Sequence, residues 1–380
     1  MPQTVVFQRV VPHYRLAIFE RLYKEFGWIV ATSRAAPEYK KLIHDEFDFI
    51  RRFDIEFPNK DNPYRAKVPI NEIIEKTGAT AIIAEFGLRI SSTYELPWLR
   101  RTKGKPIVLF WSHGFNMERG LNTPKQKLAQ SPRILLSRLV DGHLCYSDEG
   151  CAFLSRFMPK ERLFVAPNTL DVDSIKTFAL DIEPAAAPGW PHLINVGRMT
   201  PDKDFPRLIR IFRGLRASFP DAALTIIGDG ADADKVRAEA GSELGKSIHM
   251  LGAEYDEWKL AACYRSADAA VFSGAVGLSV NHALAYGVPV IAYDRTPQGP
   301  FHHPEIAYVV DGVTGVRVAT YSDEAMIQSL KAFFETHRDP KADFAERIRR
   351  HVADNLSLDG MINAFGKVDR FIKQQLDGGR

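Results

Sequence analysis

Two basic side chains follow a buried strand and precede the start of a helix. In NVGRMTPDKDF, residues 195–205, an apolar strand ends at Gly197, and Arg198 and Lys203 lie in the loop before a helix that Asp204 could cap. Amide groups at a helix N-terminus point outward, and an arginine can bind two oxygens of one phosphate. The spacing is typical of a phosphate site, although two solvated loop residues would have the same spacing.

A second glycine-rich turn lies in a stretch without charge. Residues 269–293 contain no Asp, Glu, Lys or Arg, and their number would suffice for a membrane span. Gly274, Gly277, Gly287 and Pro289 interrupt the stretch, so we predict shorter buried elements instead. These are a strand at 269–273, a turn at 274–277, a helix at 278–286 and a strand at 288–293.

The amide groups of this turn form a second candidate anion site. Gly277, Leu278 and Ser279 begin the predicted helix, so their N–H groups have no helical partner. Parallel strands end at one edge of their sheet, and two anion sites at one edge suggest a diphosphate. His282 lies one turn further along, and by itself it is either a buried core residue or a ligand contact.

Apolar strand-like segments alternate with helical periodicity along all 380 residues, which predicts an α/β protein with parallel sheets. The strands expected in the first half are 4–7, 28–31, 80–84, 107–111 and 143–146. Those expected in the second half are 192–196, 223–227, 248–251, 269–273 and 288–293. A final apolar stripe from Met361 to Ile372 predicts a long helix near the C-terminus.

The chain is long enough for two domains. Residues 180–191, LDIEPAAAPGWP, are rich in proline and are typical of a linker. We therefore predict domains at 1–178 and 192–355, a linker at 179–191, and a C-terminal helix at 356–378 that packs back on the first domain. Two doubly wound domains would leave a cleft between the carboxyl-terminal edges of their sheets, where ligands of such folds bind.

Six segments of the second half resemble, in order, the nucleotide-sugar domain of glycosyltransferase family 4. They are PNTLD at 167–171, VGRMTPDKDF at 196–205, LTIIGDG at 224–230, MLG at 250–252, GLSVNHALAYGVPVIAYD at 277–294 and PEIAYVVDGVTG at 304–315. The first half resembles the family's acceptor domain more loosely, through VPHYR at 11–15 and WSHG at 111–114.

The resemblance implies the GT-B fold, in which two Rossmann-like doubly wound domains face a central cleft. It implies a metal-independent hexosyltransferase that moves a sugar, with retention, from a UDP or GDP sugar to a glycan or lipid-linked acceptor, in bacterial polysaccharide biosynthesis. It implies no cofactor beyond this co-substrate. The positions that match the family's donor site are Gly197, Arg198, Lys203, Gly252, Gly274, Val276, Gly277, Leu278, Ser279, His282 and Glu305.

The resemblance assigns Arg198 and Lys203 to the leaving diphosphate, and we count both with His113 as catalytic residues. His113 follows a strand of the first half, where the family faces the donor sugar, although a purely structural loop histidine would fit the same position. His13 and Arg15 follow the first strand, and Glu85 follows the strand at 80–84. We expect these three on the acceptor side.

The sequence departs from the family at two positions. The family commonly has two Glu residues, of which the first contacts the donor sugar and the second holds the ribose hydroxyls. Here these positions are Gly274, which has no side chain, and His282, which could hydrogen-bond a ribose hydroxyl. A non-catalytic protein that binds nucleotide sugars is therefore an alternative function.

A dinucleotide-binding enzyme and a metal-dependent transferase receive weaker support. Residues 228–233, GDGADA, match the spacing of a dinucleotide-binding turn of an NAD-dependent oxidoreductase. However, Asp229 and Asp232 would repel a pyrophosphate, and the motif follows the second strand of its domain. Asp171 and Asp173 form a D-x-D, as in metal-dependent transferases, but an Asp-rich turn at the domain junction explains them as well.

Charge is distributed unevenly along the chain. Residues 1–180 contain 27 Lys and Arg against 20 Asp and Glu, or +7, whereas the whole chain has +3, so the remainder has −4. We consider an anionic membrane surface as a partner of the basic half, with ordinary scatter of charge as the alternative, and expect no nucleic-acid partner. Three scattered cysteines and the absence of a signal-peptide pattern predict a cytoplasmic protein, peripheral on the membrane at most.

Overall fold

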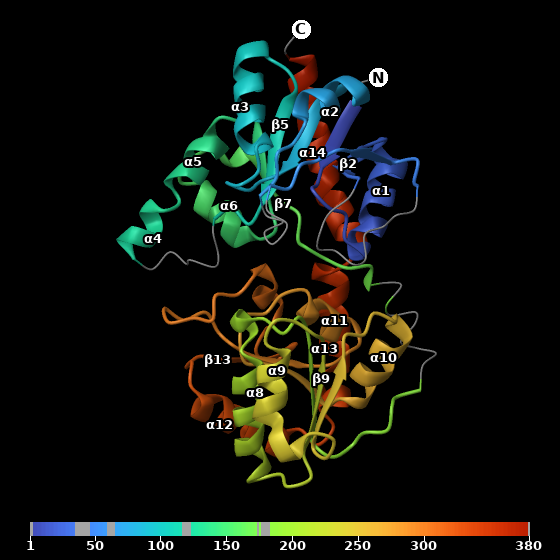
Figure 1. The fold of residues 1–380 in the computed structure, drawn as a ribbon, viewed down its shortest axis with the longest axis vertical. Coiled ribbons are helices and arrows are strands. Elements are labelled where there is room, and N and C mark those ends of the chain that lie inside the picture. The colour runs from blue at the N-terminus through green and yellow to red at the C-terminus, as the bar shows by residue number, and fades with distance from the viewer. Residues whose placement is uncertain are drawn as a thin grey trace. The chain divides into compact units, whose positions relative to one another are not determined.

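The computed structural model describes residues 3–34, 46–58, 65–115, 123–172, 175 and 183–378 (Figure 1). The chain divides into two compact units. Unit 1 contains the described residues up to Asn168 together with residues 358–378, and unit 2 contains the described residues of Thr169–Ser357. Each unit has a parallel sheet with helices, which confirms the predicted α/β fold class.

The sheet of unit 1 has seven strands in the order β3-β2-β1-β4-β5-β6-β7. They are β1 (Gln3–Phe7), β2 (Ile29–Ser33), β3 (Ile50–Phe53), β4 (Ala79–Glu85), β5 (Ile107–Ser112), β6 (Gly142–Cys145) and β7 (Leu163–Val165). Val5, Val6 and Phe7 are fully buried, because helices cover both faces of a parallel sheet.

Except for α4 (Pro124–Leu128), which has no buried residue, the helices of unit 1 bury apolar residues. They are α1 (Leu16–Phe26), α2 (Ile70–Thr77), α3 (Ser92–Lys103), α4 (Pro124–Leu128), α5 (Ser131–Arg138), α6 (Asp148–Leu154) and α14 (Leu358–Asp377), with short 3₁₀ turns η1 (His13–Arg15) and η3 (Lys160–Arg162). Helix α1 ends at Gly27, whose left-handed φ of 70° closes the helix without steric cost.

Helix α14 belongs to unit 1 although it is encoded after unit 2. It contacts α1, β5 and β7. The ring of Phe365 packs edge-on against Trp28 and Trp111, with centroid distances of 5.9 and 5.2 Å. The indole nitrogen of Trp28 donates a hydrogen bond to Asp369 at 3.3 Å. The core of unit 1 therefore requires residues from both ends of the described chain.

The sheet of unit 2 has six strands in the order β10-β9-β8-β11-β12-β13. They are β8 (His192–Val196), β9 (Ala223–Ile227), β10 (Ile248–Gly252), β11 (Ala269–Phe272), β12 (Val290–Tyr293) and β13 (Gly315–Val318). All their pairings are parallel. The strands expected at 192–196 and 223–227 have the predicted bounds.

Six helices accompany this sheet among the described residues. They are α8 (Phe205–Arg216), α9 (Ala233–Ala240), α10 (Glu257–Ser266), α11 (Ser279–Ala285), α12 (Asp323–Thr336) and α13 (Pro340–Asn355), with 3₁₀ turns η4 (Pro201–Lys203), η5 (Gly241–Glu243) and η6 (Pro304–Tyr308). Helix α8 packs between α9 and α12 (Figure 1). Its buried stripe includes Leu208, Ile209, Phe212 and Leu215, as its periodicity predicts.

The uncharged stretch at 269–293 is not one long helix. It forms β11, a turn, α11 and β12, as its glycines and Pro289 predict. Among the described residues no helix combines the length and hydropathy needed to cross a bilayer.

In each sheet there is one pair of neighbouring strands at which the strand order reverses, so the loops after these two strands lead to opposite sides of the sheet. The chain fills unit 1 from β1 toward β3 and then crosses to β4, so β1 and β4 are this pair. In unit 2 the pair is β8 and β11. Ligands of doubly wound sheets bind outside the carboxyl ends of such strands, which directs attention to the loops after β1, β4, β8 and β11.

Candidate functional site

The loop after β8 holds an exposed arginine. Strand β8 ends at Val196, and Arg198 follows Gly197 while the next residue, Met199, is buried. The guanidinium of Arg198 makes no hydrogen bond or ion pair with another described residue. It is therefore available to an anion from outside the protein.

The neighbouring loop after β9 holds this segment in place. A Cβ atom on Gly228 would lie 1.8 Å from the carbonyl oxygen of Gly197, and one on Gly230 would lie 2.5 Å from that of Met199. The amide of Met199 donates to the carbonyl of Asp229 at 2.9 Å. Backbone packing thus accounts for the two glycines of the GDGADA motif, without a dinucleotide.

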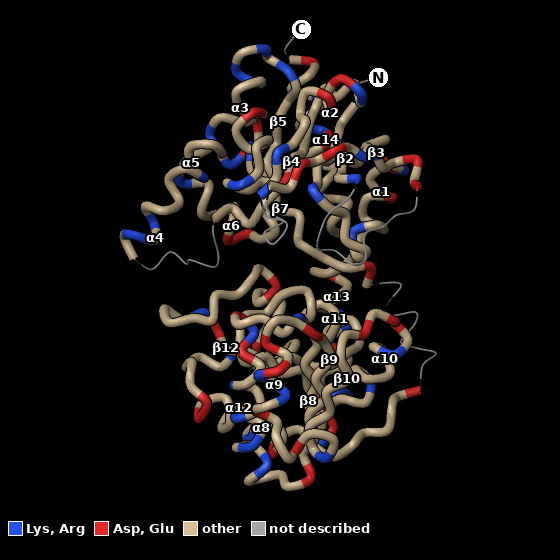
Figure 2. The backbone as a smooth tube through the Cα atoms, in the orientation of Figure 1, with Lys and Arg blue, Asp and Glu red and all other residues tan. Residues whose placement is uncertain are grey.

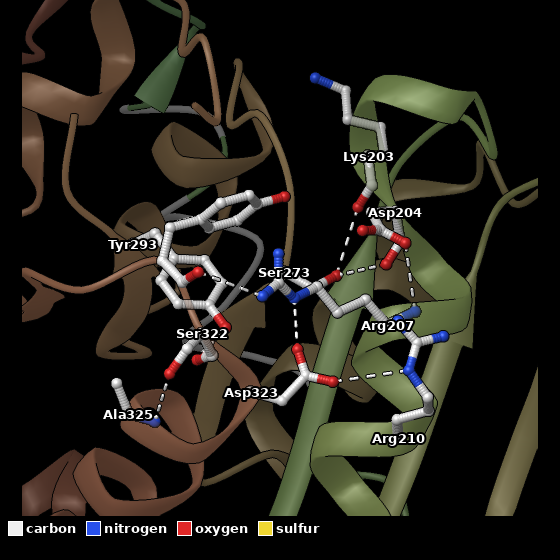
Figure 3. Close-up of polar contacts among 10 residues, drawn as sticks. Lys203, Asp204, Arg207, Arg210, Ser273, Tyr293, Ser322, Asp323 and Ala325 are labelled. Atoms are coloured by element: carbon white, nitrogen blue, oxygen red, sulfur yellow. Dashed lines mark hydrogen bonds and ion pairs between the residues drawn. The ribbon is translucent and has the colours of Figure 1, made fainter. Parts of the chain in front are cut away.

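Turn η4, which carries Lys203, is fixed by the residue that follows it. Asp204 adopts the left-handed conformation, with φ of 46°, and its carboxylate accepts a hydrogen bond from the amide of Arg207 at 3.3 Å. The buried hydroxyl of Ser273 donates to the carbonyl of Asp204 at 2.7 Å (Figure 3). The end of β11 and the start of α8 are thereby tied together.

A second set of contacts supports the same helix. The carboxylate of Asp323 contacts Nε of Arg207 at 2.5 Å and Nε of Arg210 at 3.5 Å (Figure 3). The guanidinium of Arg207 lies 3.9 Å from the ring centroid of Tyr321. This network therefore holds α8 in place through contacts within the chain.

The side chain of Lys203 extends away from that network (Figure 3). Its ammonium donates to the carbonyl oxygen of Ala275 at 2.7 Å and lies 3.2 Å from the carboxylate of Asp202. An ammonium has three N–H donors, so one is left for a ligand. Lys203 therefore links η4 to the turn after β11 and keeps capacity for an anion.

Gly274 has a structural reason to be glycine. A Cβ atom there would lie 2.4 Å from the carbonyl oxygen of Asp202 and 2.4 Å from the carbonyl carbon of Lys203. The amide of Ala275 also donates to the carbonyl of Asp202 at 2.8 Å. The backbone of η4 occupies the space that a glutamate side chain would need, so the missing Glu is a consequence of how these two loops pack.

In the rest of the turn, one backbone amide has a partner in the part of the chain that the structure describes, and three do not. The amide of Val276 donates to Nδ1 of His302 at 3.1 Å, and its side chain is fully buried. The amides of Gly277, Leu278 and Ser279 make no hydrogen bond to another described residue. The three amides predicted from the sequence can therefore meet a ligand, whereas the amide of Val276, another predicted donor-site residue, cannot.

His282 faces a carboxylate that the sequence did not indicate. Its Nε2 lies 3.6 Å from Oε1 of Glu257 on α10, and Tyr286 donates to Oε2 of the same carboxylate at 2.8 Å. Burial raises the pKa of Glu257, but the hydrogen bonds from His282 and Tyr286 and the charge of His282 lower it further, to below its ordinary value. His282 is thus held by an anion at its position on α11.

Two histidines and a glutamate follow β12. His302 is fully buried, and burial, with the nearby charges of Arg295 and Lys203, lowers its pKa to about 3. The amide of His303 donates to the carbonyl of Val276 at 3.3 Å, and Glu305 is 2% exposed at the start of η6. The sequence had indicated Glu305 but neither histidine, because the contacts of both with Val276 span 26 residues or more.

Gly252 ends β10 at the same edge of the sheet. Its carbonyl accepts a hydrogen bond from the amide of Gly228 at 2.7 Å, and its φ is 76°. A Cβ atom there would meet nothing within 4 Å. The glycine is thus required by its backbone conformation, and its contact is with the loop after β9.

In unit 1, His113 follows β5 in a tightly packed loop. The hydroxyl of Ser112 accepts a hydrogen bond from the amide of Gly114 at 3.0 Å and pairs with Nε2 of buried His143 at 2.9 Å. A Cβ atom on Gly150 would lie 2.5 Å from the carbonyl oxygen of His113, whose ring lies 4.9 Å from that of Tyr146. The position of His113 is therefore fixed by its loop.

The cations after β1 face inward. Arg15 is 6% exposed, donates to Gln8 at 2.5 Å and to the hydroxyl of Tyr146 at 2.6 Å, and lies 4.7 Å from the ring centroid of Trp111. Its contacts anchor η1 to the sheet, which is a structural task. His13, in the same turn, is exposed.

Glu85 ends β4 and pairs with Arg9, which follows β1. Its Oε1 accepts from Nη2 of Arg9 at 2.6 Å, and its Oε2 accepts from the amide of Arg9 at 3.1 Å. Burial raises the pKa of Glu85, but the charge and hydrogen bonds of Arg9 hold it below its ordinary value. Of the three predicted acceptor-side residues, the structure therefore leaves His13 open and gives Arg15 and Glu85 internal partners.

No group of three or more His, Cys, Asp or Glu side chains in the described part of the chain has the arrangement of a metal site. Asp173 of the D-x-D lies outside the described residues.

Comparisons with known proteins agree with this architecture. Residues 182–351 match the family model for glycosyl transferases group 1. An uncharacterised glycosyltransferase of Methanocaldococcus jannaschii, MJ1059, is 30% identical over 148 residues, which is 36% of this chain and 36% of that protein. The matched part is therefore about a third of this curated relative.

Solved structures resemble the whole chain. Sucrose-phosphate synthase of Thermosynechococcus elongatus superposes with a TM-score of 0.72 at 17% identity, covering 100% of both chains. HepE of Anabaena, solved with UDP-glucose, has a TM-score of 0.66 at 11% identity, covering 99% of both chains. With its two parallel sheets, this chain has the two-domain α/β GT-B fold, as predicted.

Proposed function

We propose that this protein is a glycosyltransferase that moves a sugar from a nucleoside diphosphate sugar to an acceptor hydroxyl. The observation that carries the proposal is the carboxyl-terminal edge of β8 and β11. There an exposed Arg198, the third donor of Lys203 and three available backbone amides lie within the segment that matches glycosyl transferases group 1.

The chemistry of transfer explains why these groups are suited to the role. When the bond between the sugar and the diphosphate breaks, negative charge grows on the diphosphate and positive charge on the sugar. Arg198, Lys203 and the amides of the turn are held in place before the ligand arrives, so they stabilise the departing charge without rearranging. We propose that this positive charge serves where other transferases use a metal ion.

We propose a retaining hexosyl transfer, because this is what the resemblance to glycosyltransferase family 4 implies. The acceptor would attack on the face from which the diphosphate departs. His282, oriented by Glu257, is the candidate contact to the ribose of the donor, and Glu305 is a further donor-side residue. HepE was solved with UDP-glucose, which makes UDP sugars the first donors to test, with GDP sugars second.

For the acceptor we propose a glycan or a lipid-linked sugar of bacterial polysaccharide biosynthesis, used in the cytoplasm. In unit 1, His13 and His113 are the residues that we assign to the acceptor side and the reacting centre. Arg15 and Glu85 would act indirectly, because they shape the surrounding loops.

An anionic membrane is a further proposed partner of unit 1. Lys and Arg positions lie along α3, α4 and α5 (Figure 2), and Trp98, Leu128 and Leu135 on the same helices are 62, 72 and 59% exposed. Basic and aromatic side chains together favour an anionic interface. Sedimentation with anionic vesicles but not with neutral ones, at low salt, is the expected result; equal sedimentation with both would contradict it.

Binding and transfer by point variants test the donor site. We expect Arg198→Ala and Lys203→Ala each to lower the transfer rate by about a hundred- to a thousandfold, since each removes a preorganised contact to the leaving group. Lys246→Ala is the matched control, because Lys246 is an exposed lysine that precedes β10 at the opposite edge of the sheet. Rates close to the unmodified protein in both site variants would refute the assignment.

A protein that binds nucleotide sugars without transferring them is the second candidate. The absence of a side chain at Gly274, beside Lys203, favours it. Thermal-shift measurements with UDP and GDP sugars report binding, and release of the nucleoside diphosphate reports turnover. Binding without release, with a panel of acceptors present, would select this candidate.

A further inference from the structure

His303 lies against the open side of the glycine turn. Its amide donates to the carbonyl of Val276 at 3.3 Å. A Cβ atom placed on Gly277 would meet one atom within 4 Å, the Cδ2 atom of His303, at 3.8 Å. The imidazole therefore borders the turn whose amides at Gly277, Leu278 and Ser279 are available to a ligand.

Charged groups from three loops surround the same ring. Burial lowers the pKa of His303 to about 4, assisted by the charges of Lys203, Arg295 and Arg198, while Asp202 raises it. Lys203 and Asp202 belong to η4, Arg198 to the loop after β8, and Arg295 to the loop after β12. The cations proposed to hold a diphosphate are thus, after burial, among the causes that keep this histidine neutral.

The neighbouring His302 has a different task. It is fully buried, and its Nδ1 accepts the amide hydrogen of Val276, which requires a neutral ring. Arg295 donates to the carbonyl oxygens of both histidines, at 3.2 and 3.4 Å. His302 and Arg295 hold the segment in place, and His303 is the half-buried member of the pair, next to the turn.

We propose that His303 is a further phosphate-binding residue of this site, and that it takes up one proton from solvent when a nucleoside diphosphate sugar binds. The inference rests on the proposed donor site. A bound diphosphate carries two negative charges, which offset Lys203 and Arg198 and favour the imidazolium. The charged ring then donates to a phosphate oxygen and stabilises the leaving group with the two other cations.

The direction of the pH dependence follows from linkage. In the empty protein His303 is neutral above a pH of about 4. In the complex the pKa of His303 is raised. If it reaches the ordinary histidine value of about 6.5, the donor binds about fourfold more tightly at about pH 6 than at about pH 8. The diphosphate of a nucleotide sugar is a diester that does not titrate in this range, so the proton belongs to the protein.

The test is calorimetric titration with UDP-glucose and GDP-glucose, each in two buffers of different ionisation enthalpy. The unmodified protein should take up a large fraction of a proton at about pH 6 and little at about pH 8. His303→Gln should abolish the uptake and bind with less than about a twofold difference between the two pH values. His337→Gln, at the end of α12 and outside the proposed donor site, is the matched control and should retain the uptake.

His303→Lys provides a rescue experiment, because lysine remains charged across this range. It should restore tight binding at about pH 8 without proton uptake. Thermal melts of each variant report whether it is folded. Uptake that persists in His303→Gln would overturn the role of His303 and leave the donor site standing. An unmodified protein that binds neither sugar nucleotide would overturn both.

Discussion

The two sheets end in loops of similar composition that are used in opposite ways. At the edge of β1 and β4 in unit 1, Arg9 is paired with Glu85, and Arg15 is buried against Gln8 and Tyr146. At the edge of β8 and β11 in unit 2, Arg198 is exposed, and Lys203 contacts a carbonyl and a partly exposed Asp202. At the first edge the arginines have partners within the protein, whereas at the second edge Arg198 and Lys203 keep hydrogen-bond donors for a ligand.

The difference shows that a cation after a parallel strand does not by itself identify an anion site. What decides is whether the surrounding loops supply a partner. In unit 1 the strand that neighbours β1 ends in a carboxylate, Glu85. In unit 2 the strand that neighbours β8 leads into Gly274, whose position admits no side chain, so this strand supplies Lys203 with a backbone carbonyl and no carboxylate.

The first prediction, with the largest expected effect, is that acid lowers the stability of unit 2 more than that of unit 1. Burial is the main cause that lowers the pKa values of His192 and His303 to about 4 and that of His302 to about 3. In the described part of unit 1, one histidine, His143, has a pKa lowered as far, to about 3. The unfolded chain, with ordinary values of about 6.5, binds more protons, so stability falls as pH drops below about 6.5.

We expect a loss of about 2 kcal/mol per such histidine between about pH 7 and about pH 5. Hydrogen exchange followed by mass spectrometry, corrected for the intrinsic effect of pH, separates the two units. Peptides from β8, β9 and β11 should lose protection before those from β1, β4 and β5. Equal loss in both units would contradict the expected difference.

The second prediction concerns the closed edge. Glu85→Ala leaves Arg9, whose side chain is 10% exposed, without its carboxylate, and we expect a loss of about 3 kcal/mol of unfolding free energy. Arg198→Ala should change stability by less than about 0.5 kcal/mol, because no described residue pairs with its guanidinium. Thermal or urea unfolding of both variants compares them, and a destabilised Arg198→Ala would show that this cation also supports the fold.

The smallest predicted effect separates two glycines of one turn. Gly274→Ala places a methyl group against the backbone of η4 and should cost about 2 kcal/mol. Gly277→Ala meets nothing closer than His303 at 3.8 Å, so its melting temperature should match that of the unmodified protein. Its affinity for UDP-glucose should fall, because the methyl group stands where the ligand approaches. Matching stabilities in the two variants would mean that η4 can move away from Gly274.

Local pattern predicted much of the fold. Apolar runs and glycine stops placed β8 and β9 with their observed bounds and divided the stretch at 269–293 correctly. The strands β3, β7 and β13 were not predicted. In β3 and β13, Arg51, Arg52 and Arg317 interrupt the apolar run that marks a buried strand, and β7 has three residues, all half-buried.

The site was predictable in its residue types but not in its partners. Gly274 looked like a lost glutamate, because only the folded chain shows how closely η4 approaches it. The carboxylate that faces His282 comes from Glu257, on another helix. The ring of His303 reaches Gly277 from a segment beyond the next strand. Contacts between loops of different strands leave no periodic mark in the sequence.

Helix α14 has a consequence for the order in which the protein is made on the ribosome. The described residues of unit 2 all lie within Thr169–Ser357, whereas Trp28 and Trp111 of unit 1 pack against Phe365, and Trp28 also donates to Asp369, both of which are synthesised later. During synthesis the second unit can complete its core while the first still lacks the apolar side chains that α14 adds to its core. A nascent chain halted before residue 358 would therefore be a chaperone client through its N-terminal half.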